Sequence, residues 1–162
     1  MYGHGANMHF GSQTNPSLWS GTIIAKGGDG GAGIGGGRNG SGEKLYFYSG
    51  KIEAKGGEAA SGIGGSYKGR GSEIYIYGGT VSAQGGEGGA GIGGGCWTTE
   101  QDMNGINAAH DIYISGGTVT APVAGTYDAT TNWLDTTRAD NTAHVDHANV
   151  LYQIPADSNG WP

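Results

Sequence analysis

The sequence predicts an all-β fold, a parallel β-solenoid (β-helix) with coils of about 29 residues, Gly-rich turns and an irregular C-terminal cap. Three observations predict it. The motif GIGG recurs so that Ile34, Ile63 and Ile92 stand 29 residues apart. Short runs that alternate apolar and polar side chains lie between the motifs, as in β-strands. One pair of such strands cannot bury its apolar face, whereas like units stacked in parallel can.

The repeat divides the chain into three parts. Residues 18–122 hold the repeats, residues 1–17 are expected to be a lead-in or cap, and residues 123–162 an irregular cap or continuation. The last step of the repeat carries nine extra residues, which places an insertion near 96–109. The length of 162 residues suits one domain or a piece of a longer repeat protein.

Each repeat unit contains two short alternating runs. LYFYSGKIEA follows the first Gly run and IYIYGGTVSA the second, and each reads as two short strands around a Gly-containing turn. Gly content and β-branched residues argue against helix. The polar tail shows one further candidate strand, at Asn149–Ile154. These runs predict two strands per coil.

Gly-rich runs such as GGDGGAGIGGG follow the strands. Gly permits φ > 0 and close backbone approach, so the runs are read as tight corners, with the Ile of each GIGG anchoring the corner inside. Flexible spacers between hairpins are the alternative. An Ile at a fixed place in every run has no purpose in a spacer, which favours the corners.

Stacking in register turns like side chains into columns. The inward columns are expected to form the core. They are Leu45, Ile74 and Ile112; Phe47, Ile76 and Ile114; Ile23, Ile52, Val81 and Val119; and Ala25, Ala54, Ala83 and Ala121.

Aromatic residues alternate with the core residues along the strands and are expected to point outward. One column is Tyr46, Tyr75 and Tyr113, and a second is Trp19, Tyr48 and Tyr77. An exposed row of aromatic rings can bind sugars, because Tyr offers large contact area at low entropic cost together with a hydroxyl. The competing interpretation is structural, since aromatic ladders also stabilise sheets.

Acidic residues also recur at the repeat spacing. Asp29, Glu58 and Glu87 form a carboxylate column, and like charges stacked at strand spacing repel. Lys26 and Lys55 stand three residues earlier in two of the coils and are one means of compensation. A bound Ca²⁺ is a second, because hard cations take carboxylate oxygens, and plain solvation of the carboxylates is a third.

Composition and charge exclude several classes. The net charge is −6 and the eight Lys and Arg residues do not cluster, which argues against nucleic acid and anionic membranes as partners. Cys96 is the only cysteine, so an intrachain disulfide is excluded. No apolar stretch approaches the roughly 18 residues of a membrane span. The start of the chain does not read as a signal peptide, so an exported parent is expected to carry its leader outside this chain.

Other polar clusters predict little chemistry. In HVDH, His144 and His147 would point to opposite faces of a strand, which disfavours joint metal binding. The acidic residues outside the repeat pattern are Glu100, Asp102 and Asp111. They lie around the insertion that holds Trp97, where a specific pocket could form. No nucleophile–base pair and no acid–base dyad stands out.

The segment GAGIGGG followed by IYIYGGTVSAQGG resembles the glycine-rich, β-helix-like repeats of large surface proteins from Gram-positive gut bacteria. The resemblance covers roughly residues 18–122. It implies a carbohydrate-binding or adhesive module on a cell surface and is specific for the repeat class rather than for any ligand.

These observations favour a non-catalytic extracellular module, on a cell or virion surface, that binds carbohydrate through the outward aromatic ladder. Self-association through the solenoid ends is a further expectation, because open ends expose unpaired strand edges. The expected glycan contacts are Tyr46, Tyr75, Tyr113, Tyr48, Tyr77 and Trp97, with Asp29, Glu58 and Glu87 as a Ca²⁺ column. Two alternatives stay open: a structural repeat or fibre subunit with no small ligand, and a fragment of a β-helix enzyme that degrades polysaccharides.

Overall fold

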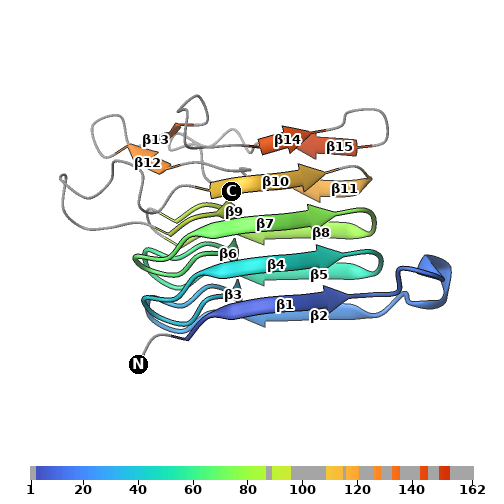
Figure 1. Ribbon diagram of the computed structural model, residues 1–162, viewed down its shortest axis with the longest axis horizontal. Coiled ribbons are helices and arrows are strands. Elements are labelled where there is room, and N and C mark those ends of the chain that lie inside the picture. The colour runs from blue at the N-terminus through green and yellow to red at the C-terminus, as the bar shows by residue number, and fades with distance from the viewer. Residues whose placement is uncertain are drawn as a thin grey trace.

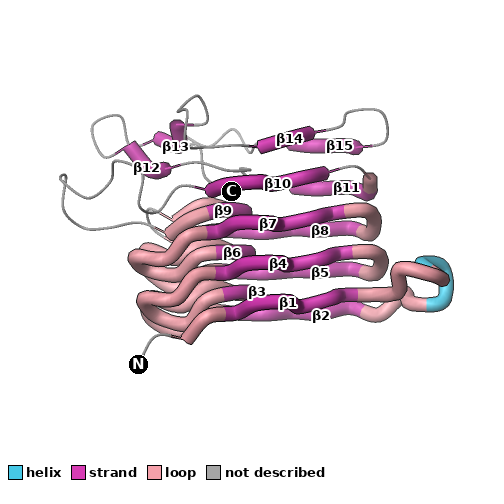
Figure 2. Tube along the Cα trace, viewed as in Figure 1, coloured by secondary structure: helices cyan, strands magenta, loops and turns pink. Residues whose placement is uncertain are grey.

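The computed structural model describes residues 3–86, 89–95, 109–114 and 116–120, and after them the strands at 126–128, 133–135, 143–145 and 150–153 (Figure 1). The described chain is a parallel β-solenoid, as the sequence predicts. Its strands stack coil upon coil along one axis, and corner loops join them at both ends (Figure 2).

Three parallel sheets build the solenoid, which we call sheets A, B and C. Sheet A contains, in spatial order, β1 (Gly5–Phe10), β4 (Gly42–Phe47), β7 (Gly71–Ile76), β10 (Ala109–Ile114) and β14 (Ala143–Val145). Sheet B contains β2 (Thr22–Lys26), β5 (Lys51–Lys55), β8 (Thr80–Gln84), β11 (Gly117–Thr120) and β15 (Val150–Gln153). Sheet C contains β3 (Ile34–Gly35), β6 (Ile63–Gly64) and β9 (Ile92–Gly93).

One short helix and one strand pair lie outside these three sheets. A 3-10 helix, η1 (Pro16–Leu18), lies in the loop between β1 and β2. β12 (Thr126–Asp128) and β13 (Trp133–Asp135) form an antiparallel pair. The strand expected at Asn149–Ile154 is confirmed, since β15 pairs with β11 and extends sheet B.

The register follows the 29-residue repeat. Leu45 pairs with Ile74, and Ile74 with Ile112, so the first core column forms as predicted. Ile34, Ile63 and Ile92 pair in the same way in sheet C, so the Ile of each Gly run anchors its corner inside the solenoid. Side chains of the described columns are buried almost completely, apart from the partly exposed Ile23 and Ala25 of the first coil. The side chain of Ile114, and Ala121, lie outside the described residues.

Close backbone contact explains the Gly runs. Gly64 has φ of 123°, which side-chain-bearing residues rarely adopt, and a Cβ there would overlap the carbonyl oxygen of Gly93 in the next coil. A Cβ at Gly42 would overlap the carbonyl oxygen of Gly64. Sheets A and C therefore approach each other through positions that have no room for a side chain.

The first coil differs from the prediction. Residues 5–10, expected in a lead-in or cap, form β1 and pair with β4 in parallel register, Gly5 with Gly42 and Phe10 with Phe47. The offset is 37 residues rather than 29, because the loop with η1 intervenes before β2. The prediction that Trp19 joins the column of Tyr48 is therefore wrong, because Tyr48 follows the strand that pairs with β1. Trp19 packs against the core, and its ring lies where a Cβ on Gly50 would stand.

Candidate functional site

Aromatic side chains gather on the outer face of sheet A. Tyr46, Tyr75 and Tyr113 come from β4, β7 and β10, which pair in register, so the predicted column forms. Tyr48 and Tyr77 follow the ends of β4 and β7 and form the second column. His9 of β1 extends the first column by one coil. We call these six side chains the aromatic strip: His9, Tyr46, Tyr48, Tyr75, Tyr77 and Tyr113.

The rings of the strip stack along the solenoid axis. Ring centroids are 5.0 Å apart between Tyr46 and Tyr75 and 5.1 Å apart between Tyr75 and Tyr113, with planes within 5° of parallel. The second column repeats this at 5.4 Å between Tyr48 and Tyr77. The two columns run side by side, with centroids 6.4 Å apart in one coil and 6.2 Å apart in the next. The strip is therefore a regular two-column array.

The first coil continues the stack with a different ring. The centroid of His9 lies 4.5 Å from that of Tyr46, and the planes differ by 13°. Its Nδ1 also lies 3.2 Å from the hydroxyl oxygen of Tyr48, within hydrogen-bond distance. Sequence reasoning missed His9 because the 37-residue offset of β1 hides it from the 29-residue pattern.

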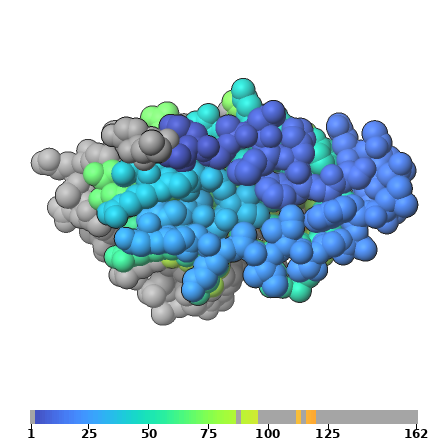
Figure 3. Space-filling model, turned by 90° about the horizontal axis from the view of Figure 1, so that it is seen from below, coloured from blue at the N-terminus to red at the C-terminus, as the bar shows by residue number. Residues whose placement is uncertain are grey.

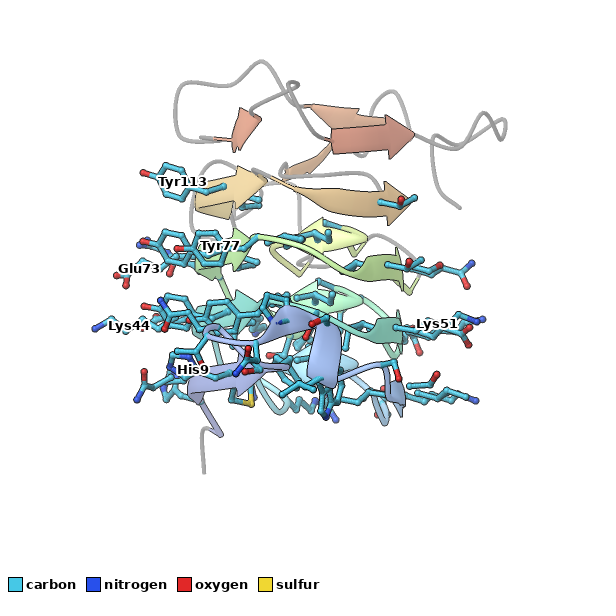
Figure 4. The ribbon with its side chains drawn as sticks, turned by 90° about the vertical axis from the view of Figure 1, so that its right-hand side faces the viewer. His9, Lys44, Lys51, Glu73, Tyr77 and Tyr113 are labelled. Carbon is cyan, nitrogen blue, oxygen red and sulfur yellow. The ribbon has the colours of Figure 1, made fainter. Side chains whose placement is uncertain are left out.

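The stacking fixes what the strip presents to solvent. A sugar ring inserted between two tyrosine rings would need two van der Waals separations, about 7 Å in total. Every distance between ring centroids in the strip is shorter than this, so the ring faces mainly contact one another. Tyr113 extends away from its strand with the hydroxyl oxygen at its outer tip (Figure 4). The strip therefore offers ring edges and hydroxyl groups rather than separate open ring faces.

Burial and neighbouring charge raise two tyrosine pKa values. Desolvation raises the pKa of Tyr75 above 10.0, and the nearby Glu73 carboxylate and the tyrosines around it raise it further. The pKa of Tyr48 is raised by desolvation and then by Tyr77 and Tyr46. The hydroxyls of Tyr48 and Tyr75 therefore stay protonated at neutral pH and can both donate and accept hydrogen bonds.

The carboxylate column lies elsewhere, at the Gly-rich corners. Asp29 forms an ion pair with Arg38 across 3.4 Å, with both side chains largely exposed. Lys26 and Lys55 pair in register with each other on sheet B, and neither forms an ion pair with Asp29 or Glu58. Arg38, not a lysine, is therefore the described counterion of Asp29.

A shallow, open depression of about 270 Å³ lies at this corner. Its lining residues are Asp29, Gly30, Arg38, Glu58, Ala59 and Tyr67. The Arg38 guanidinium carbon lies 5.7 Å from the centre of the Tyr67 ring, and the Lys68 ammonium nitrogen 5.1 Å from it. No group of three or more His, Cys, Asp or Glu side chains suited to a metal ion occurs within the described residues. Glu87 is outside them, so the full column remains a prediction.

The remaining predicted glycan contact, Trp97, falls outside the described part of the chain. The same holds for the other polar residues considered in the sequence: Glu100, Asp102, Cys96, His147 and the side chains of Asp111 and His144. The described site is thus the aromatic strip together with the corner at Asp29.

The stacked parallel sheets define the class of protein as a β-solenoid repeat protein. Four segments of the chain match a family model described as a beta helix repeat, at residues 19–38, 48–67, 74–96 and 112–126. The comparisons with curated proteins and with solved structures found no match. Within the described residues, no helix has the length and apolar character needed to cross a membrane. β-Helix repeats support both surface modules and enzymes, so the fold alone does not decide the function.

Proposed function

We propose that this chain is a non-catalytic, extracellular surface module that binds carbohydrate through the aromatic strip. The observation that carries the proposal is the regular array of tyrosines on one outer face of the solenoid. Tyr77 is 47% exposed, and Tyr46, Tyr48, Tyr75 and Tyr113 are partly exposed. Aromatic side chains with polar tips are common at binding surfaces, because they supply contact area and hydrogen bonds at low entropic cost.

The geometry of the strip suits a repeating ligand. Its phenol groups recur at the coil spacing, near 5 Å, in two columns. Ring edges and hydroxyls can meet the hydroxyls and C–H groups of successive sugars, each contact being weak on its own. Several contacts along one chain of sugars add up, as in any multivalent association. The strip therefore favours a polysaccharide over a single small sugar.

A structural role is the second candidate, and a specific observation favours it. The rings stack on one another at 5.0–5.4 Å and thereby stabilise the pairing of the strands that carry them. For a spacer or fibre subunit, this stabilisation of the strands is sufficient and no ligand is needed. The two candidates differ in what a tyrosine substitution removes, binding in the first and only stability or assembly in the second.

Binding to a broad panel of glycans and polysaccharides, beside the Tyr75→Ala and Tyr75→Phe variants, tests the proposal. We expect hits that weaken strongly in Tyr75→Ala. Tyr75→Phe keeps the stack and removes one hydroxyl, so it reports on hydrogen bonding alone. Ile24→Ala is the control, since Ile24 is a large exposed side chain on β2 of sheet B, outside both the aromatic strip and the corner at Asp29. A blank panel with folded protein would overturn the glycan proposal in favour of the structural role.

The same assay tests the proposed Ca²⁺ at the carboxylate column. Carboxylate oxygens at Asp29 and Glu58 line one depression and are suitable ligands for a hard cation. If calcium supports binding, EDTA will reduce it and added calcium will restore it. Glycan binding that is indifferent to EDTA would remove calcium from the proposal and leave the aromatic strip unaffected.

A further inference from the structure

Three residues beside the aromatic strip have a backbone conformation that normally belongs to glycine. Asn7, Lys44 and Glu73 have φ values of 55°, 56° and 51°, and they occupy equivalent places in β1, β4 and β7. The residues on either side of this position pair with the neighbouring strand, as Leu45 does with Ile74. The position itself is not paired in any of the three strands. We call these three residues the left-handed row.

The left-handed row is costly for residues that carry a side chain, because Cβ crowds the backbone at positive φ. Glycine avoids that cost, and the chain has 37 glycines. It places them at other positive-φ positions, such as Gly35, Gly64 and Gly93. Asn39, Ala59 and Lys68 in the corner loops also have positive φ, so this conformation alone does not mark a function. The left-handed row differs in lying within the strands of sheet A, beside the strip, where retained strain points to a function for the side chains.

The left-handed conformation also changes which way the side chains face. Glu43 and Lys44 are successive residues that both reach solvent between the buried Gly42 and Leu45. In an ordinary strand one of them would point inward. Glu73 follows the same pattern in β7, where it and Ser72 are both partly exposed. The first three coils therefore each gain one extra outward side chain, two residues before His9, Tyr46 and Tyr75 respectively.

The extra side chains lie on the face of the strip. Lys44 and Glu73 project on the same side as His9, Tyr77 and Tyr113, and Lys51 projects on the opposite side (Figure 4). The Glu73 carboxylate is close enough to Tyr75 to influence its titration. Within the described residues neither Lys44 nor Glu73 takes part in an ion pair. Their charges are therefore available to a ligand on the strip.

We propose that Asn7, Lys44 and Glu73 determine the specificity of the strip, for an uncharged linear glycan lying along the solenoid axis. This inference rests on the proposed function. An amide, an ammonium and a carboxylate follow one another from coil to coil, so the row offers donors and acceptors with no net charge. A polyanion would meet Glu73, and a polycation would meet Lys44. The strip itself extends along the axis by stacking, which sets the direction of the ligand.

Substitution of the row by glycine gives an unusual test, because it removes the side chain and the strain together. We expect Lys44→Gly and Glu73→Gly each to weaken binding of a neutral polysaccharide hit by about tenfold or more, as loss of a hydrogen bond from a charged group would. The midpoint of thermal unfolding should not fall. A destabilised variant would instead show that the side chains serve the fold, which would overturn the proposal.

Lys68→Gly is the matched control. Lys68 is also a lysine at positive φ, 63°, so the substitution changes charge and backbone in the same way as Lys44→Gly. It lies over Tyr67 in the corner loop before β7 and not in sheet A. We expect Lys68→Gly to leave glycan affinity unchanged. Equal losses in Lys44→Gly and Lys68→Gly would reduce the effect to overall charge and overturn the proposal.

A comparison of ligands separates this inference from the function it rests on. Neutral glycans should bind with little dependence on salt, and affinity should rise with the number of sugar units until the described coils are spanned. Acidic glycans that bind better than neutral ones, or single sugars that bind as well as polymers, would overturn the inference while glycan binding itself stands. If no glycan binds, both the inference and the proposed function fail.

Discussion

At the scale of single residues, the fold depends on glycines at positions that have no room for a side chain. Gly64 lies at the junction of sheets A and C with φ of 123°, and its Cα faces the carbonyl of Gly93. Gly28 belongs to the same kind of Gly-rich run, yet nothing lies within 4 Å of the place where its Cβ would stand. The runs therefore mix glycines required by close packing with glycines that only cost conformational entropy.

These two glycines predict opposite responses to alanine. Gly64→Ala should lower the free energy of unfolding by more than about 1 kcal/mol, because both the positive φ and the overlap with Gly93 oppose a Cβ. Gly28→Ala should leave it unchanged or raise it by about 0.4–1 kcal/mol, through the entropy of the unfolded chain. Urea unfolding of both variants measures the contrast. Equal stability of the two would contradict the close coil contacts.

At the scale of elements, sheet A couples tyrosines that are far apart in the sequence. Tyr48 and Tyr75 have pKa values raised by desolvation first and by neighbouring groups second. The folded state therefore holds these protons more tightly than the unfolded chain, where tyrosine titrates near 10. By linkage this stabilising contribution is present below about pH 10 and is lost as the pH rises through the folded pKa values.

Titration of tyrosinate absorbance checks this coupling. Subtracting the curve of Tyr75→Phe from that of the parent protein isolates Tyr75, and we expect its midpoint above that of the unfolded chain. Glu73→Gln should move that midpoint down, because it removes the nearest negative charge that raises the pKa. The urea midpoint should also fall as the pH rises beyond 10. A Tyr75 midpoint that ignores Glu73→Gln would show that the two groups do not interact.

The elements also show what sequence reasoning could and could not reach. A constant 29-residue period fixes the register of Leu45, Ile74 and their neighbours, because parallel stacking places like residues opposite each other. The period does not apply where a loop changes the number of residues between neighbouring coils, as the loop before β2 does. For this reason the repeat pattern does not predict β1 or the place of His9. The left-handed conformation of Lys44 and Glu73 leaves no sequence signal, because neither residue type favours positive φ. The ion pair of Asp29 with Arg38 depends on the conformation of the corner loop, which the 29-residue repeat does not predict.

At the scale of the whole molecule, the end of the solenoid formed by the first coil exposes the core. β1, β2 and β3 are each the last described strand on that side of their sheets. The inward side chains of this coil, such as Met8, are only partly buried, whereas Leu45 one coil above is fully buried. Figure 3 views the molecule from this end and shows it covered largely by residues of the first coil. Apolar layers that end in open strand edges favour pairing with another chain.

We therefore expect the protein to self-associate through this end as its concentration rises, and Met8→Lys to prevent it. An inward lysine at a sheet edge is a means by which natural β-proteins block pairing, and the partly exposed site lets the ammonium group reach water. Met8→Leu is the control, since it keeps volume and apolar character. Sedimentation velocity over a range of concentrations, with circular dichroism to confirm folding, distinguishes the variants. A parent protein that stays monomeric throughout would contradict end-to-end association, and equal association of Met8→Lys and Met8→Leu would place the contact elsewhere on the molecule.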